Sequence, residues 1–239
     1  MSPSRKSAAA GEPADRNPKR KAARGRPVGR GATRENILRA ALEVFAKHGF
    51  AGARVEKISK AAHSTDRMIY YYFGSKERLF VAVLESIYEE LGAAEAALDL
   101  AGMSPEDGLR AIVRFTWNYY CEHPELLSLL NNENMYQGRH LIHSKKVQEL
   151  SFPLLSILST IYAQGLQQRV FRPGVVVQDL YIAICGLGYF YLSNRFTLSA
   201  FLGTDLMAPV ALGNWPQVME DAVLRFVTTE HPGARTDAD

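Results

Sequence analysis

Residues 55–73 read VEKISKAAHSTDRMIYYYF, and this stretch decides the fold of the 239-residue chain. It contains two short helical patterns, and the second is expected to bury Ile69 and the Tyr72–Phe73 end. The first is expected to bury Val55, Ile58, Ala61 and Ala62. His63-Ser64-Thr65 forms a corner between them, and the Thr65 hydroxyl is a candidate cap for the second helix. Two short helices that meet at such a corner form a helix-turn-helix, whose second helix fits the DNA major groove.

The flanking segments extend this pattern into a small helical unit. Upstream, Thr33 to His48 is an amphipathic helix with Thr33 as its expected N-cap and Gly49 as its stop. Downstream, Ser75 is expected to cap a long helix that reaches about Leu91. The free N–H groups at the start of that helix, together with Lys76, make a candidate phosphate site.

Residues 33 to about 91 resemble the N-terminal domain of the tetracycline-repressor (TetR) family. The matching positions are Ile37, Leu38, Ala41, Val44, Phe45, His48, Gly49, Phe50, Val55, Ile58, Ala61, Ala62, Ile69, Tyr70, Tyr72, Phe73, Ser75, Lys76, Glu77 and Leu79. The resemblance implies an all-α chain. It places a three-helix DNA-binding domain at 33–91, with the helix-turn-helix at about 54–73, and a helical effector-binding and dimerisation domain at 104–231.

The chain departs from the family pattern at three places. Arg54 stands where a threonine usually opens the first helix of the motif. His63 replaces a glycine of the corner, so a positive φ is expected at a residue that tolerates it at some cost. Asp66-Arg67-Met68 replaces the common Lys-Gly-Thr. The DNA sequence that this chain prefers therefore cannot be transferred from a relative.

The second helix of the motif offers side chains for both bases and phosphates. Arg67 is the candidate for a guanine edge, and Met68 or Thr65 for a thymine methyl. Tyr70, Tyr71 and Lys76 are expected on phosphates, whereas Asp66 is expected to cap the helix or pair with Arg67. The predicted DNA-binding residues are Arg24, Arg26, Arg54, Thr65, Asp66, Arg67, Met68, Tyr70, Tyr71 and Lys76.

Positive charge is concentrated at the N-terminus. Residues 1–34 contain ten Lys and Arg against two acids, a net charge of +8; the whole chain is +3, which leaves −5 for residues 35–239. Residues 1–32 are expected to be a disordered basic arm because their composition cannot build a core. Within it, Arg24-Gly25-Arg26-Pro27 resembles an AT-hook, so the arm either reads the minor groove or attracts phosphates without sequence preference.

The remainder of the chain reads as further helices. Ser104-Pro105 is a strong helix start, and Pro124 opens the next helix. A long helix is expected over 144–168, bent at Pro153. By the resemblance, two final helices at about 177–199 and 215–230 would pair with their copies in a second subunit, and a dimer doubles the contacts on a palindrome.

The resemblance also implies an effector pocket between these helices. The candidate lining residues are Trp117, Tyr120, Asn131, Asn134, Met135, Tyr162, Tyr191 and Arg195. The competing interpretation is that the aromatic residues form ordinary core. The polar run Asn131–Asn134 must be solvated or matched by partners wherever it is buried. Within it, Glu133 is either a further polar contact for the effector or the partner of Arg139.

Other classes of protein find little support in the sequence. It contains no nucleophile–base pair, phosphate loop or metal-ligand set, so we expect no enzyme, cofactor or metal. No signal peptide or run of about 18 apolar residues is present, which argues against a membrane span. Cys121 and Cys185 are expected to be buried thiols, because two cysteines are too few for a disulfide scaffold. They indicate a reducing compartment, and the protein is expected in the bacterial cytosol, at the nucleoid.

The sequence therefore predicts a DNA-binding transcriptional regulator. The expected form is a homodimeric repressor that binds a palindromic operator on double-stranded DNA and is released by a small-molecule effector. An activator of the same family and a weakly specific architectural DNA-binding protein remain as alternatives.

Overall fold

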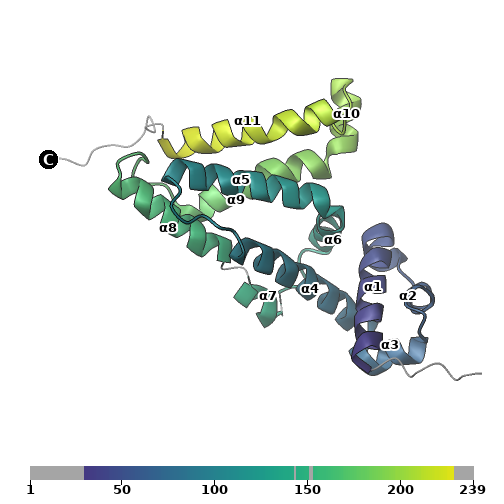
Figure 1. Ribbon diagram of the computed structural model, residues 1–239. Coiled ribbons are helices and arrows are strands. Elements are labelled where there is room, and N and C mark those ends of the chain that lie inside the picture. The colour runs from purple at the N-terminus through teal and green to yellow at the C-terminus, as the bar shows by residue number, and fades with distance from the viewer. Residues whose placement is uncertain (1–29, 143, 151–152, 229–239) are drawn as a thin grey trace, which may run out of the picture.

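The computed structural model describes residues 30–142, 144–150 and 153–228, and within these ranges it forms eleven α-helices and no strand (Figure 1). This confirms the all-α prediction. The helices are α1 (Arg30–Gly52), α2 (Val55–Ala61), α3 (Asp66–Phe73), α4 (Lys76–Ala96), α5 (Pro105–Glu122), α6 (Pro124–Met135), α7 (Lys145–Leu150), α8 (Pro153–Gln167), α9 (Val177–Ser193), α10 (Arg195–Leu202) and α11 (Pro209–Thr228).

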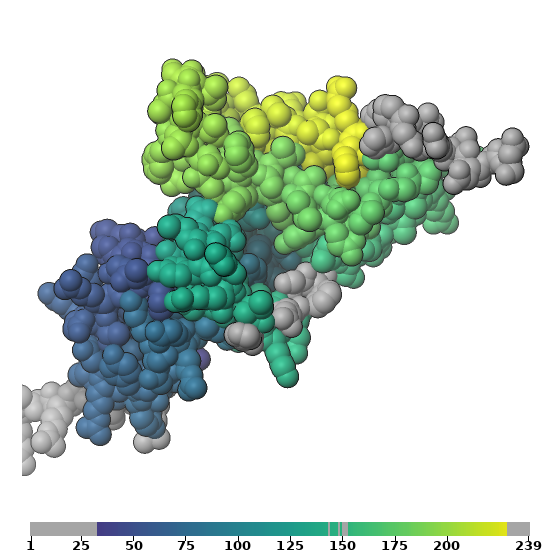
Figure 2. All heavy atoms as spheres, turned by 180° about the vertical axis from the view of Figure 1, so that it is seen from behind, coloured from purple at the N-terminus to yellow at the C-terminus, as the bar shows by residue number. Residues whose placement is uncertain are grey.

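Two parts of the molecule are distinct in Figure 1. Helices α1 to α3 gather around the start of α4 and form the part that we call the head. Helices α5 to α11 form the part that we call the body, and α4 runs from the head along the body. Figure 2 shows the head projecting from the body, so that α2 and α3 lie at one end of the molecule.

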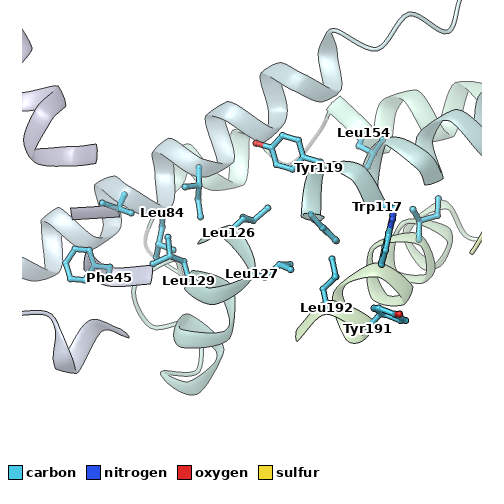
Figure 3. Packing of buried hydrophobic residues seen from close by; sticks show 14 of the residues in the cluster. Phe45, Leu84, Trp117, Tyr119, Leu126, Leu127, Leu129, Leu154, Tyr191 and Leu192 are labelled. Atoms are coloured by element: carbon cyan, nitrogen blue, oxygen red, sulfur yellow. The ribbon is translucent and has the colours of Figure 1, made fainter. Parts of the chain in front are cut away.

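The head closes around a core in which Ile37, Phe45, Ile58, Ile69 and Phe80 are all fully buried. These residues come from all four helices of the unit, so each short helix is held by packing rather than by its own propensity. Figure 3 shows how buried apolar residues continue from Phe45 and Leu84 in the head to Leu126 and Leu129 of α6, the helix that packs on α1.

Several predicted helix ends in the head can be compared with the structure. Gly49 interrupts α1 with φ 65° and ψ 174°, as expected, and the Ser75 hydroxyl caps α4 by accepting from the Arg78 N–H at 3.2 Å. The expected start at Thr33 is wrong, since α1 begins at Arg30. Thr65 occupies the N-cap position of α3 but makes no side-chain cap bond, so that prediction is also wrong. Ala61 is exposed, contrary to expectation, because Ala62 occupies the packed position at the end of α2.

The body confirms the starts of α5 and α6. Ser104 accepts from the Asp107 N–H at 3.1 Å with Pro105 in the first turn of α5, and Pro124 opens α6. A long bent helix over 144–168 is replaced by two helices, α7 and α8, because Pro153 starts a helix instead of bending one.

The last two predicted helices also have different bounds. The segment 177–199 divides at Asn194 into α9 and α10. The final helix starts at Pro209 rather than near residue 215, and Pro216 lies inside it. Proline is favoured in the first turn of a helix, where its missing N–H is not needed, and this explains the earlier start.

The two cysteines are free, and Cys121 is exposed, so the expectation of a buried thiol is wrong at that position. Cys185 is half-buried on α9, and burial raises the pKa of its thiol to about 11. Among the described residues, no helix combines the length and hydropathy that crossing a membrane requires.

A buried carboxyl group on α4 should make stability depend on pH. Burial raises the pKa of Glu95 from 4.5 to about 7, while a backbone hydrogen bond from Leu154 acts in the opposite direction. The folded protein therefore holds this proton more tightly than the unfolded chain. Its contribution to stability is complete below about pH 4.5 and is lost as the pH rises through about 7.

We expect the free energy of unfolding of the wild type to fall between about pH 5 and pH 8 relative to that of Glu95→Gln. Glutamine retains a carbonyl oxygen for the Leu154 N–H but does not titrate. Thermal unfolding of both proteins across this range provides the measurement. Parallel stability curves would show that Glu95 ionises in the folded protein as it does in the unfolded chain.

Candidate nucleic-acid interface

Helix α3 divides into a buried and an exposed face. Ile69 and Phe73 are buried in the head, whereas Tyr70 and Tyr71 are 51% and 65% exposed. Arg67 is exposed on the same outer side. This confirms the prediction that Tyr71 lies outside the core. The exposed face offers one guanidinium and two phenol hydroxyls, which are groups that contact bases and phosphates.

The corner between α2 and α3 is held by a side-chain hydrogen bond. His63 adopts φ 49°, so it takes the glycine-like conformation that its position predicted. The Ser59 hydroxyl donates to Asp66 Oδ1 at 2.5 Å, which ties the middle of α2 to the start of α3. Asp66 was expected to cap the helix or pair with Arg67, and its partner in the structure is Ser59 instead. The packing of α2 on α3, which periodicity alone does not specify, brings the two side chains together.

A basic hollow lies beside the exposed face of α3. Its lining brings together the start of α2 and the start of α4. It includes four cations and one acidic residue beside Tyr70: Arg54, Lys57, Lys60, Lys76 and Glu56. Three of the predicted DNA-binding residues, Arg54, Tyr70 and Lys76, therefore share one surface. A cluster of cations beside an exposed helix attracts the DNA backbone.

Lys76, which is half-buried, is one of the residues that line this hollow. Its ammonium lies 4.7 Å from the centroid of the Phe50 ring, and burial lowers the pKa of the group. The cation–π contact and the position of Lys76 at the start of α4 hold its charge near the hollow.

The other predicted DNA-binding residues differ in exposure. Met68 is half-buried and packs against the core, so it is less available for a thymine methyl than Thr65, which is exposed. Arg24 and Arg26, with the rest of the predicted arm through residue 29, lie outside the described residues.

Three candidate effector residues lie in the middle of the body. Trp117, Tyr120 and Tyr191 are all buried, and the Trp117 and Tyr191 rings meet edge to face at 5.4 Å (Figure 3). The Tyr191 hydroxyl donates to the Leu206 carbonyl at 2.9 Å. These aromatic residues pack against one another as core.

The other candidates are spread over the body. The Tyr162 hydroxyl donates to the Arg172 carbonyl and accepts from the Val175 N–H, which fixes the loop before α9. Met135 is 83% exposed. The Arg195 guanidinium lies over the Phe196 ring and donates to a carbonyl of α9. The structure therefore does not gather the eight residues around one site.

The polar run at the end of α6 finds its partners within the chain. Asn131 Oδ1 accepts from the Tyr189 hydroxyl. The oxygen of that hydroxyl in turn accepts a weak hydrogen bond from Asn134 Nδ2 at 3.4 Å. The Asn132 side chain accepts from the backbone N–H of Phe50 at 2.9 Å. Sequence reasoning singled out this run for its polarity but did not assign Asn132 a contact with α1.

Glu133 is almost fully buried, and its partners are residues of the turn after α6 rather than Arg139. Its carboxylate accepts from the His140 and Leu141 N–H groups at 2.7 and 3.0 Å and lies 2.6 Å from His140 Nδ1. Arg139 instead lies over the Tyr136 ring at 4.8 Å. The alternative of a Glu133–Arg139 pair is wrong because the turn after α6 folds the backbone of 140–141 back onto the carboxylate. Among the described residues, no three His, Cys, Asp or Glu side chains form a group that could hold a metal ion.

Family models match both parts of the chain. The model described as "Bacterial regulatory proteins, tetR family" matches residues 37–83, and "Tetracyclin repressor-like, C-terminal domain" matches residues 105–223.

Curated relatives carry regulatory names. The chain is 47% identical over 193 residues to the HTH-type transcriptional repressor NicS of Pseudomonas putida, covering 81% of this chain and 91% of that protein. It is 38% identical over 121 residues to the HTH-type transcriptional repressor SCO4008 of Streptomyces coelicolor, covering 49% of this chain and 58% of that one.

Solved structures share the fold at lower identity. A bacterial regulatory protein in the tetR family from Rhodococcus RHA1 superposes with a TM-score of 0.64 at 19% identity, covering 84% of this chain and 98% of that one. A putative transcriptional regulator, SCO4942 from Streptomyces coelicolor, gives a TM-score of 0.61 at 24% identity, covering 82% and 98%.

Proposed function

The chain belongs to the TetR family of DNA-binding transcriptional regulators, and we propose that it is a homodimeric repressor released from a palindromic operator by a small-molecule effector. The observation that supports operator binding most directly is the exposed face of α3, with Arg67, Tyr70 and Tyr71, beside the basic hollow. We assign DNA binding to residues 33–91 and effector binding with dimerisation to residues 104–231. The arm of residues 1–32 adds contacts to the minor groove or to phosphates.

An apolar groove on the body supports the dimer. It is lined by Ile182, Ala183, Gly186 and Leu187 of α9 and by Ala222, Val223 and Phe226 of α11. Ile182 is 62% exposed, and a Cβ at Gly186 would meet nothing within 4 Å. Gly188, by contrast, packs inside the chain against Tyr120. A second copy of the same two helices would remove this apolar surface from water.

Dimerisation has a physical role in recognition. One short recognition helix reaches few base pairs, and a two-fold pair reads two half-sites one helical turn apart. An effector that binds the body more tightly in a state with a different head spacing then weakens operator binding.

The proposal is tested by selecting the preferred duplex from a randomised pool and measuring the mass of the protein in solution. We expect a palindromic sequence, a dimer, and at least about a 1,000-fold preference for the selected duplex over random DNA. Near-equal affinity for all duplexes would instead identify a DNA-coating protein.

A reporter gene behind the selected duplex distinguishes repression from activation. Titration of the complex with a panel of small metabolites then tests release, and a complex that no member weakens would argue against effector control.

A further inference from the structure

Helix α6 of the body restores hydrogen bonding that helix α1 of the head loses at Gly49. With φ 65° and ψ 174° at Gly49, the backbone leaves the helical conformation between Ala46 and Phe50. In a continuous helix the N–H of Phe50 would bond to the carbonyl of Ala46, four residues earlier. Here Asn132 Oδ1 accepts from the Phe50 N–H at 2.9 Å, and the Ser128 hydroxyl donates to the Ala46 carbonyl at 2.5 Å. Ser128 and Asn132 lie one turn apart on the same face of α6, and this face therefore supplies both partners.

The contact is tight enough to fix the two helices relative to each other. A Cβ at position 49 would lie 2.6 Å from Asn132 Nδ2, so the amide rests directly against the backbone of α1. The Phe50 ring packs on His140 and Tyr136 of the body, with centroids at 4.7 and 5.7 Å. The Lys76 ammonium, which lines the basic hollow, lies over the same ring in a cation–π contact. The position of Phe50 thus links the body to the surface proposed to contact DNA.

The same turn of α6 is also tied to α9. The Tyr189 hydroxyl donates to Asn131 Oδ1, and Asn131 Nδ2 donates to the Ser193 hydroxyl at 3.4 Å. Asn131 and Asn132 are adjacent, so one turn of helix connects α9, which lines the apolar groove, with α1 in the head. Figure 1 shows α6 in this intermediate place, between the head and the end of α9.

We propose that Ser128 and Asn132 are positioning residues for operator recognition, because they set the angle at which each head stands on the dimer. This inference rests on the proposed dimeric, sequence-specific function. Two recognition helices fit successive grooves only if both heads are held at a defined spacing. Binding to random DNA depends on the basic surface and needs no such spacing.

The test compares variants of the full chain on DNA of different half-site spacing. The probes are the duplex selected by the wild-type protein, the same duplex with its half-sites moved apart by one or two base pairs, and random-sequence DNA. Asn132→Ala and Ser128→Ala remove one bond each; Ser128→Ala deletes only a hydroxyl and should fold normally. Asn132→Asp keeps an acceptor oxygen for the Phe50 N–H. Glu122→Ala, at an exposed position of α5 outside this contact, is the control.

We expect Asn132→Ala to bind the selected duplex about three- to thirty-fold more weakly and to discriminate less between spacings, with random DNA bound as by the wild type. Ser128→Ala should change in the same direction, while Asn132→Asp and Glu122→Ala keep the wild-type spacing profile. A merely structural role would lower the melting temperature and weaken binding to all three classes of DNA together. Folded Ser128→Ala and Asn132→Ala proteins with the wild-type spacing profile would overturn the inference. A wild-type protein without any preferred duplex would instead refute the proposed function.

Discussion

Arg67→Ala is expected to weaken operator binding by about 2–6 kcal/mol, at least roughly 30-fold, without changing the melting temperature. The guanidinium is exposed on the outer side of α3, so its removal leaves no cavity in the head. Each lost bidentate contact to a base removes about 1–3 kcal/mol, and a dimer carries two copies. The measurement is the dissociation constant for the selected duplex at fixed salt, beside circular dichroism of the folded protein.

Two further variants separate base reading from charge. Arg169→Ala removes the same charge from the exposed turn after α8 in the body, and it should bind the operator as the wild type does. Tyr71→Phe should weaken binding to all duplexes to a similar extent, because a phosphate contact carries no sequence information. If Arg67 and Tyr71 can both be replaced without effect on the retention of the selected duplex, α3 does not enter the groove.

Glu133→Ala is expected to have the largest effect on stability, a loss of at least about 3 kcal/mol in the free energy of unfolding. The carboxylate is 2% exposed and accepts from two backbone N–H groups and from His140 Nδ1. Alanine would leave all three groups without their acceptor, and each buried unsatisfied group costs about 1–3 kcal/mol. Urea or guanidinium unfolding at constant pH measures the loss.

Matched variants test the physical reason. Glu133→Gln keeps one carbonyl oxygen and should lose less stability than Glu133→Ala. Glu125→Ala removes a half-buried carboxylate that lies 3.1 Å from His123 Nδ1, and it should cost no more than about 1 kcal/mol. Equal losses for Glu133→Ala and Glu125→Ala would mean that the turn over 136–141 is not held by the buried carboxylate.

Much of the head follows from the sequence because its signals are local. The stop at Gly49, the cap at Ser75, the positive φ of His63 and the exposure of Tyr71 each depend on residues within a turn or two. In the body, the Ser104 cap and the Pro124 start were predictable for the same reason. Helix periodicity and capping chemistry act over short stretches of chain and can be read without knowing what packs where.

The tertiary structure decided the partners of the polar side chains. Asp66 bonds to Ser59, Glu133 to the turn at 140–141, and Asn132 to the backbone of α1. Each partner lies across a helix contact or a chain reversal, from seven to 82 residues away. Hydrophobic spacing states which face of a helix is buried but not which helix covers it. The sequence by itself therefore determined an all-helical regulator in which one face of α3 is exposed. The packing of α6 on α1 and α9 decided how the head is held on the body, because only that packing brings distant polar groups within hydrogen-bonding distance.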